Sequence, residues 1–235
     1  MIGTADPIIE KMRTYNGAVD PYRLARAFEF GKVAHDGQTR ASGEPYFTHP
    51  VAVANILADM HLDEDSIITA LLHDTVEDCD VTLETLQTEF GGDVSQLVDG
   101  VTKLSRLAIK SLPSSAQAEN FRKLLMAMSE DVRVLLVKLA DRTHNMRTLS
   151  FIPKPEKRMR IARETMDIYA PLAERIGLTQ IQSELEDSAF EILNGDMRQS
   201  IITRLDYLTS GRRSPFPPSV SSCNRQSNVS VLNAA

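Results

Sequence analysis

The chain has 235 residues, of which 42% are apolar and 25% are charged, and its formal net charge is −6 at pH 7. These proportions are ordinary for a globular protein with a substantial core. An acidic chain without a basic arm is poorly suited to neutralising nucleic-acid phosphates, so we expect no DNA partner. Because the N-terminus lacks a signal core and no apolar run reaches the length of a membrane span, we expect a cytoplasmic protein without a membrane partner.

Helical patterns recur along the chain, whereas patterns typical of strands are weak, so the sequence predicts an all-α fold. Proline or capping residues mark several helix starts, with Thr48 as the expected N-cap of one helix. Pro171 is expected to end or kink another, and residues 108–116 are expected to form a loop. The predicted helices cover residues 21–35, 48–60, 63–78, 82–90, 93–107, 117–128, 131–149, 156–176, 179–193 and 197–208.

The composition changes abruptly at Thr209. The residues that follow are rich in serine and proline, contain no acidic residue and show no helical period, so we expect disorder. We therefore predict an N-terminal segment at 1–20, one helical domain at 21–208, and a disordered or non-native tail at 209–235.

The motif "LLHDTVED" places four ionisable side chains at the end of an apolar run: His73, Asp74, Glu77 and Asp78. On a helix, residues four apart share a face, so His73 would lie over Glu77 and Asp74 over Asp78. The bland interpretation is a solvated charge cluster. A second histidine, His49, stands at the start of the helix in "GEPYFTHP", where it is either a ligand or a capping residue.

A polar stripe crosses an otherwise apolar helix in "KLADRTHNMRTL". Lys138, Asp141, Asn145 and Thr148 are spaced by three, four and three residues, which puts them on one face. A buried helix with one polar stripe favours a functional site, although the stripe could also cap neighbouring helices.

His49, His73, Asp74 and Asp141 together would make a ligand set of two imidazoles and two carboxylates. Such a set, without a thiolate, suits manganese, iron, zinc or nickel, and ligand softness does not choose among them. An ion held there could activate a water, and Glu77 or Asp78, next along the chain, could orient that water or accept its proton.

Beyond these residues, longer segments resemble the hydrolase domain of the RelA/SpoT homologues, the bifunctional enzymes of alarmone metabolism, within the HD metal-dependent phosphohydrolases. The similarity covers about residues 20–208. It is carried by "SGEPYFTHPVAVANILADM", "LLHDTVED", "FGGDVSQLVDGVTKL", "AENFRKLLMAMSEDVRVLLVKLADRTHNMRTL" and "ARETMDIYAPLAERIGL".

The resemblance implies an all-helical HD domain that removes the 3′-pyrophosphate of ppGpp or pppGpp, in alarmone turnover during the stringent response. It implies Mn²⁺ held by the four ligands named above, with Glu77 and Asp78 serving catalysis. It also implies nucleotide contacts from Arg40, Ser42, Asn145 and Thr148, with Arg40 packing on the guanine. Lys138 and Arg142 are expected either to counter phosphate charge or to make structural ion pairs.

Two departures from the family pattern accompany the resemblance. Ala41 stands where many members carry a second basic residue, which puts one phosphate or base contact in doubt. The tail also begins where a synthetase domain is expected, so the chain is expected to be truncated before that domain. Two alternatives stay open: another HD phosphohydrolase acting on dNTPs or cyclic nucleotides, and a non-catalytic nucleotide-binding regulatory fragment.

Overall fold

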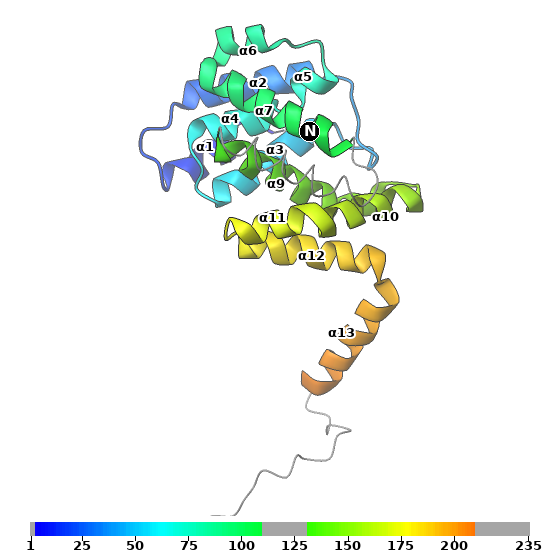
Figure 1. Cartoon of the computed structure of the whole chain (residues 1–235). Coiled ribbons are helices and arrows are strands. Elements are labelled where there is room, and N and C mark those ends of the chain that lie inside the picture. The colour runs from blue at the N-terminus through cyan, green and yellow to red at the C-terminus, as the bar shows by residue number, and fades with distance from the viewer. Residues whose placement is uncertain (1–2, 110–130, 210–235) are drawn as a thin grey trace, which may run out of the picture. The chain divides into compact units, whose positions relative to one another are not determined.

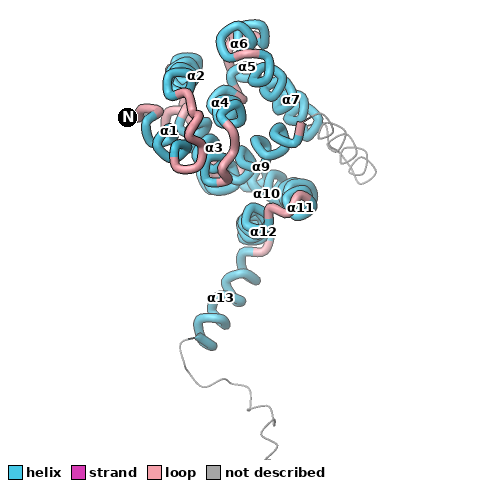
Figure 2. Tube along the Cα trace, turned by 90° about the vertical axis from the view of Figure 1, so that its left-hand side faces the viewer, coloured by secondary structure: helices cyan, strands magenta, loops and turns pink. Residues whose placement is uncertain are grey.

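The computed structural model describes residues 3–109 and 131–209. Within these ranges every named element is helical, as Figure 2 shows, and the predicted all-α class is confirmed. The chain divides into two compact units, Met1–Leu193 and a second that begins at Asn194. The helix predicted at 117–128, most of the loop predicted at 108–116 and the tail after Thr209 lie outside the described residues.

Eight helices lie in the described residues of the first unit that precede Thr148 (Figure 1). They are α1 (Asp6–Arg13), α2 (Pro21–Ala34), α3 (Thr48–Asp59), α4 (Glu64–Leu72), α5 (Thr75–Asp78), α6 (Leu83–Phe90), α7 (Gly92–Ile109) and α9 (Val132–Arg147). Helix α7 includes Ala108 and Ile109, so it runs slightly further than predicted.

The core is built around α4, which packs against α2, α3, α7 and α9. Every residue of α4 from Ser66 to Leu72 is buried, so the apolar run that precedes His73 forms the centre of the unit. Close packing against α2 depends on Gly31, because a Cβ there would lie 2.6 Å from the Phe47 ring and 2.8 Å from the carbonyl oxygen of Leu71.

Capping residues explain several helix boundaries. The Asp20 side chain accepts from the backbone N–H groups of Tyr22 and Arg23 at the start of α2, and Thr82 accepts from Thr85 at the start of α6. The prediction that Thr48 is an N-cap is wrong. Thr48 is the first helical residue of α3, and its hydroxyl instead donates to the carbonyl of Pro45 at 2.8 Å.

The single helix predicted over 63–78 is divided, because α4 ends at Leu72 and α5 begins at Thr75. Two side chains take the carbonyls that a continuous helix would use for its backbone bonds. His73 Nδ1 lies 2.8 Å from the oxygen of Ala70, and the Thr75 hydroxyl donates to the oxygen of Leu72 at 2.7 Å. The break leaves His73 and Asp74 between two helices.

The rest of the first unit is a second helical layer against α9. It consists of η1 (Leu149–Phe151), α10 (Pro155–Glu164), η2 (Thr165–Tyr169), α11 (Ala170–Arg175) and α12 (Thr179–Leu193). The long helix expected over 156–176 is interrupted by η2, a π-helical turn. Pro171 explains the interruption, because its nitrogen cannot donate to the carbonyl four residues back.

The second unit contains one described helix, α13 (Gly195–Thr209). Among the described helices of both units, none has the combined length and apolarity that a membrane span requires.

Candidate metal centre

Three structural elements bring the four predicted metal ligands together. His49 lies in the first turn of α3, His73 and Asp74 occupy the break between α4 and α5, and Asp141 lies in the second half of α9. Because α4 packs on both α3 and α9, residues that are far apart in the sequence meet in the interior.

The donor atoms of these residues converge. His49 Nε2 lies 3.2 Å from an oxygen of Asp141 and 3.7 Å from an oxygen of Asp74, and His73 Nε2 lies 3.1 Å from the other Asp74 oxygen. One donor atom from each of His49, His73 and Asp141 lies within 4.8 Å of the others. His49, His73 and Asp141 are buried, so water does not compete freely for their donor atoms.

The tautomer of His73 fits a ligand. A carbonyl only accepts, so the 2.8 Å contact with Ala70 places the proton on Nδ1. Nε2 is then a bare lone pair, and it is buried without a hydrogen-bond partner among the described residues. The Asp74 oxygen 3.1 Å away cannot supply one, because a carboxylate oxygen and a bare imidazole nitrogen are both acceptors. An orphaned lone pair facing carboxylates is what a divalent cation would satisfy.

A second imidazole contacts His49 at Nδ1, the ring nitrogen that does not face the aspartates. Its Nδ1 lies 2.7 Å from Nδ1 of His144, one helical turn before the end of α9. Burial, together with the charges of His49 and Arg40, lowers the pKa of His144 to about 4, so its ring is neutral at pH 7. A neutral His144 can accept the Nδ1 proton of His49, which leaves Nε2 of His49 free to bind an ion.

Asp141 carries its charge inside the protein because a cation neutralises it. The Lys138 ammonium lies 2.6 Å from one Asp141 oxygen, and both side chains are largely buried. Burial alone would raise the pKa of the Asp141 carboxyl, but the neighbouring Lys138 ammonium holds it well below its usual range. Burial also disfavours the charged form of Lys138 and would by itself lower the pKa of its ammonium. The neighbouring Asp141 carboxylate raises that pKa by more than burial lowers it. The pair therefore stays ionised.

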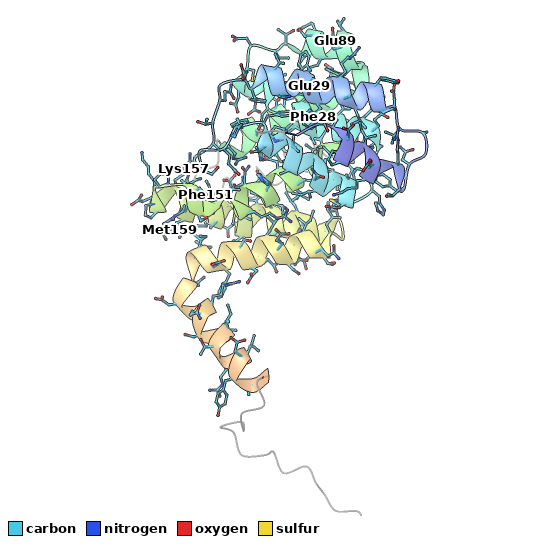
Figure 3. All side chains as sticks on the ribbon, turned by 180° about the vertical axis from the view of Figure 1, so that it is seen from behind. Phe28, Glu29, Glu89, Phe151, Lys157 and Met159 are labelled. Carbon is cyan, nitrogen blue, oxygen red and sulfur yellow. The ribbon has the colours of Figure 1, made fainter. Side chains whose placement is uncertain are left out.

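A cavity of about 500 Å³ opens beside this centre, and His49, Asp74 and Asp141 form part of its wall. Cationic side chains gather on the same wall. They are Arg40 from the loop after α2, Lys138 and Arg142 from α9, and Lys157 and Arg160 from α10. Phe151 and Lys157, which Figure 3 labels, lie on the wall contributed by η1 and α10.

The predicted nucleotide-binding residues also reach this cavity: Arg40, Ser42, Lys138, Asn145 and Thr148 all line it. The guanidinium of Arg40 donates to Asn145 Oδ1 at 3.0 Å and to the Thr148 hydroxyl at 3.4 Å, which ties the loop to α9. Arg142 is also engaged, since it pairs with Glu164 at 3.2 Å and lies 4.0 Å from the ring centroid of Tyr169.

The two predicted catalytic carboxylates are placed differently. Glu77 lines the cavity, and partial desolvation raises the pKa of its carboxyl even though Lys138 opposes that shift. Asp78 is exposed and is absent from the cavity wall formed by the described residues. It lies 3.1 Å from the hydroxyl of Tyr46 instead.

Sequence reasoning missed four contributors to the site: Tyr46, His144, Lys157 and Arg160. His144 lies among the stripe residues of α9, and Tyr46 lies one helical turn before His49, so their positions gave a usable signal. Lys157 and Arg160 lie in a strongly charged segment, "PEKRMRIARE", whose pattern is also typical of a solvated helix.

The described helices thus bring two histidines and two aspartates close together, with His49, His73 and Asp141 buried. The family model described as "HD domain" matches residues 27–179, and the chain belongs to the HD-domain family.

The chain's relatives within this family are RelA/SpoT homologues. It is 50% identical over 206 residues to the "GTP pyrophosphokinase rsh" of Brucella ovis, covering 88% of this chain and 27% of that protein. It is 56% identical over 170 residues to the "Guanosine-3′,5′-bis(diphosphate) 3′-pyrophosphohydrolase" of Vibrio cholerae, covering 72% of this chain and 24% of that protein. The chain thus spans about a quarter of the length of these relatives.

The fold also resembles a solved structure, described as "A metazoan ortholog of SpoT hydrolyzes ppGpp and plays a role in starvation responses". The match has a TM-score of 0.56 and 27% sequence identity, and it covers 74% of this chain and 97% of that one.

Proposed function

We propose that this chain is a metal-dependent hydrolase that removes the 3′-pyrophosphate of ppGpp or pppGpp and releases GDP or GTP with pyrophosphate. One observation carries the proposal: the buried cluster of His49, His73 and Asp141, with Asp74 beside it, borders a cavity of about 500 Å³ whose wall bears five cationic side chains. A highly charged nucleotide requires such cations. The relatives whose names or descriptions include ppGpp hydrolysis support the choice of substrate.

His49, His73, Asp74 and Asp141 are the residues that would hold the ion. The orphaned Nε2 of His73 and the mixture of imidazole and carboxylate donors fit a divalent cation. We propose Mn²⁺, because the family resemblance implies it and because this donor set suits it. Such an ion would supply Lewis acidity at a phosphoryl oxygen and lower the pKa of a water at the centre.

The protein's own side chains divide the remaining work. Glu77 lies on the cavity wall with a raised pKa, so its carboxylate is a stronger base than an ordinary glutamate and can accept a proton from the attacking water. Lys138 and Arg142 place positive charge next to the ligand Asp141, where a pyrophosphate group would come to lie. The ion pairs of Lys138 with Asp141 and of Arg142 with Glu164 support the structural role considered from the sequence, and countering phosphate charge is the role proposed here.

Recognition of the guanine is assigned to Arg40 and its neighbours on the cavity wall. Arg40 presents a planar guanidinium that can stack on a purine, and its bonds to Asn145 and Thr148 fix the orientation of that plane. Ser42 lies on the same stretch of the wall and is available to the base or ribose.

The test is product identification with chelator-treated protein. Aliquots with and without Mn²⁺ would be incubated separately with ppGpp, dATP and a cyclic dinucleotide, and the products separated by anion-exchange chromatography. We expect GDP and pyrophosphate from ppGpp only in the presence of Mn²⁺. Turnover of dATP or the cyclic dinucleotide in preference to ppGpp would indicate another HD phosphohydrolase. Binding of ppGpp without any product would indicate a regulatory fragment.

A further inference from the structure

One phenol hydroxyl connects two of the acidic residues at the site. Tyr46 Oη lies 2.8 Å from Oδ2 of Asp74 and 3.1 Å from Oδ2 of Asp78. A hydroxyl has a single proton to donate, so it serves one carboxylate at a time. Two carboxylates thus share one donor, and one of the two is a predicted metal ligand.

The ring of Tyr46 is fixed independently of this hydroxyl. It stacks on the buried ring of His35, with centroids 4.8 Å apart and planes 25° apart. The Arg40 guanidinium carbon lies 5.9 Å from the centroid of the Tyr46 ring, and the backbone N–H of Tyr46 donates to the carbonyl of Gln38 at 2.9 Å. Removing the oxygen alone would therefore leave the ring in place.

The two neighbouring carboxylates, Glu77 and Asp78, contact the site in different ways. Glu77 and Asp78 are both exposed, but Glu77 lines the cavity directly, whereas Asp78 meets the centre through the Tyr46 hydroxyl. The orientation of Asp74 depends on that same hydroxyl. Partners that orient a ligand carboxylate commonly change metal affinity by about 10-fold to 100-fold when they are removed.

We propose that Tyr46 is a positioning residue of the metal centre and that Asp78 acts through it. The Tyr46 hydroxyl orients the Asp74 carboxylate toward His49 and His73, and Asp78 competes for the same hydroxyl proton from the solvent side. In this arrangement Asp78 affects hydrolysis by changing how firmly the hydroxyl orients a metal ligand. The inference rests on the proposed metal-dependent function of the same site.

The test measures metal binding without any nucleotide, which separates it from the test of hydrolysis. Mn²⁺ would be titrated by calorimetry into the chelator-treated full chain, comparing wild type, Tyr46→Phe, Asp78→Asn and the double variant. Tyr15→Phe is the matched control, because it removes a hydroxyl that donates to the Leu62 carbonyl at 2.9 Å. Circular dichroism would confirm that each variant is folded.

We expect Tyr46→Phe to weaken Mn²⁺ binding about 10-fold or more, while Tyr15→Phe changes nothing measurable. The double variant should bind no more than about twofold more weakly than Tyr46→Phe alone, because residues that act through one contact are not additive. A Tyr46→Phe affinity within about twofold of wild type would overturn the role of Tyr46. Additive losses in the double variant would overturn the route from Asp78 through Tyr46. If wild type binds Mn²⁺ but leaves ppGpp intact, the proposed function fails while the positioning role can still be decided.

Discussion

Replacing Lys138 with methionine removes the cation that neutralises Asp141 while keeping a long apolar side chain. The ammonium lies 2.6 Å from the Asp141 carboxylate, and the exposed side-chain fractions of the two residues are 12% and 7%. Breaking a buried pair by deleting one partner costs about 3 kcal/mol or more, because the other charge stays buried and unpaired. For a unit of this size, each kcal/mol shifts the melting temperature by roughly 2–4 °C, so a decrease of roughly 6–12 °C is expected.

Thermal unfolding of chelator-treated protein, followed by circular dichroism, measures this effect. Lys103→Met is the matched control, because Lys103 pairs with Asp99 at the surface with 68% of its side chain exposed. Solvent screening should keep that change within about 0.5 kcal/mol. Adding Mn²⁺ should narrow the difference between Lys138→Met and wild type, because a cation at the centre supplies charge that Lys138 no longer provides. Equal shifts in the two variants would refute the assignment of Asp141 as a buried anion that depends on Lys138.

Three further outcomes follow from the site and its surroundings. Arg40→Ala should raise the KM for ppGpp about 10-fold or more while leaving the calorimetric affinity for Mn²⁺ unchanged. Arg40→Lys should restore nucleotide binding only in part, because an ammonium lacks a stacking plane. A normal KM for Arg40→Ala would argue against base stacking. His144→Phe should weaken Mn²⁺ binding about 10-fold, since Nδ1 of His49 loses its acceptor, and an unchanged titration would show that the contact is not needed. Asp131→Asn should destabilise the chain by roughly 0.5–1 kcal/mol at pH 7. Asparagine can still cap α9, but it loses the charge-assisted hydrogen bonds from the Arg133 guanidinium, which lower the pKa of the Asp131 carboxyl. A lowered folded pKa contributes stability above the unfolded value of about 3.9 and loses it as the pH falls further. The free energies of unfolding in urea of wild type and Asp131→Asn should therefore converge as the pH falls through the lowered pKa of the folded Asp131 carboxyl, and a difference that persists once this carboxyl is protonated would contradict the assignment.

The helical class and most helix positions were accessible from sequence because they depend on local signals. Apolar periodicity located α9 and α12, and a capping threonine with a following glycine located both ends of α6. The errors occurred where side chains compete with backbone hydrogen bonding. The break after Leu72 depends on His73 and Thr75 bonding to carbonyls in the preceding turn, and no periodicity reports that competition.

The metal ligands could be proposed because histidine and aspartate are uncommon inside apolar helices, so His73 and Asp141 were conspicuous. The contacts around the centre could not be predicted from the sequence, because they depend on tertiary packing. The contact between His49 and His144 joins residues 95 apart in sequence. The separation of Glu77 and Asp78, one on the cavity wall and one behind Tyr46, follows from the local course of a short helix. Neighbouring carboxylates in a motif therefore do not share an environment.

The proposed function depends most directly on coupling between an ion at the His49–His73–Asp74–Asp141 centre and ppGpp hydrolysis. Wild type and Asp74→Ala would be stripped with chelator, given back Mn²⁺, analysed for bound metal by mass spectrometry, and assayed for GDP and pyrophosphate. We expect wild type to recover metal and activity together, and Asp74→Ala to recover neither. Hydrolysis by stripped wild type, or full turnover by Asp74→Ala after Mn²⁺ is returned, would contradict the account.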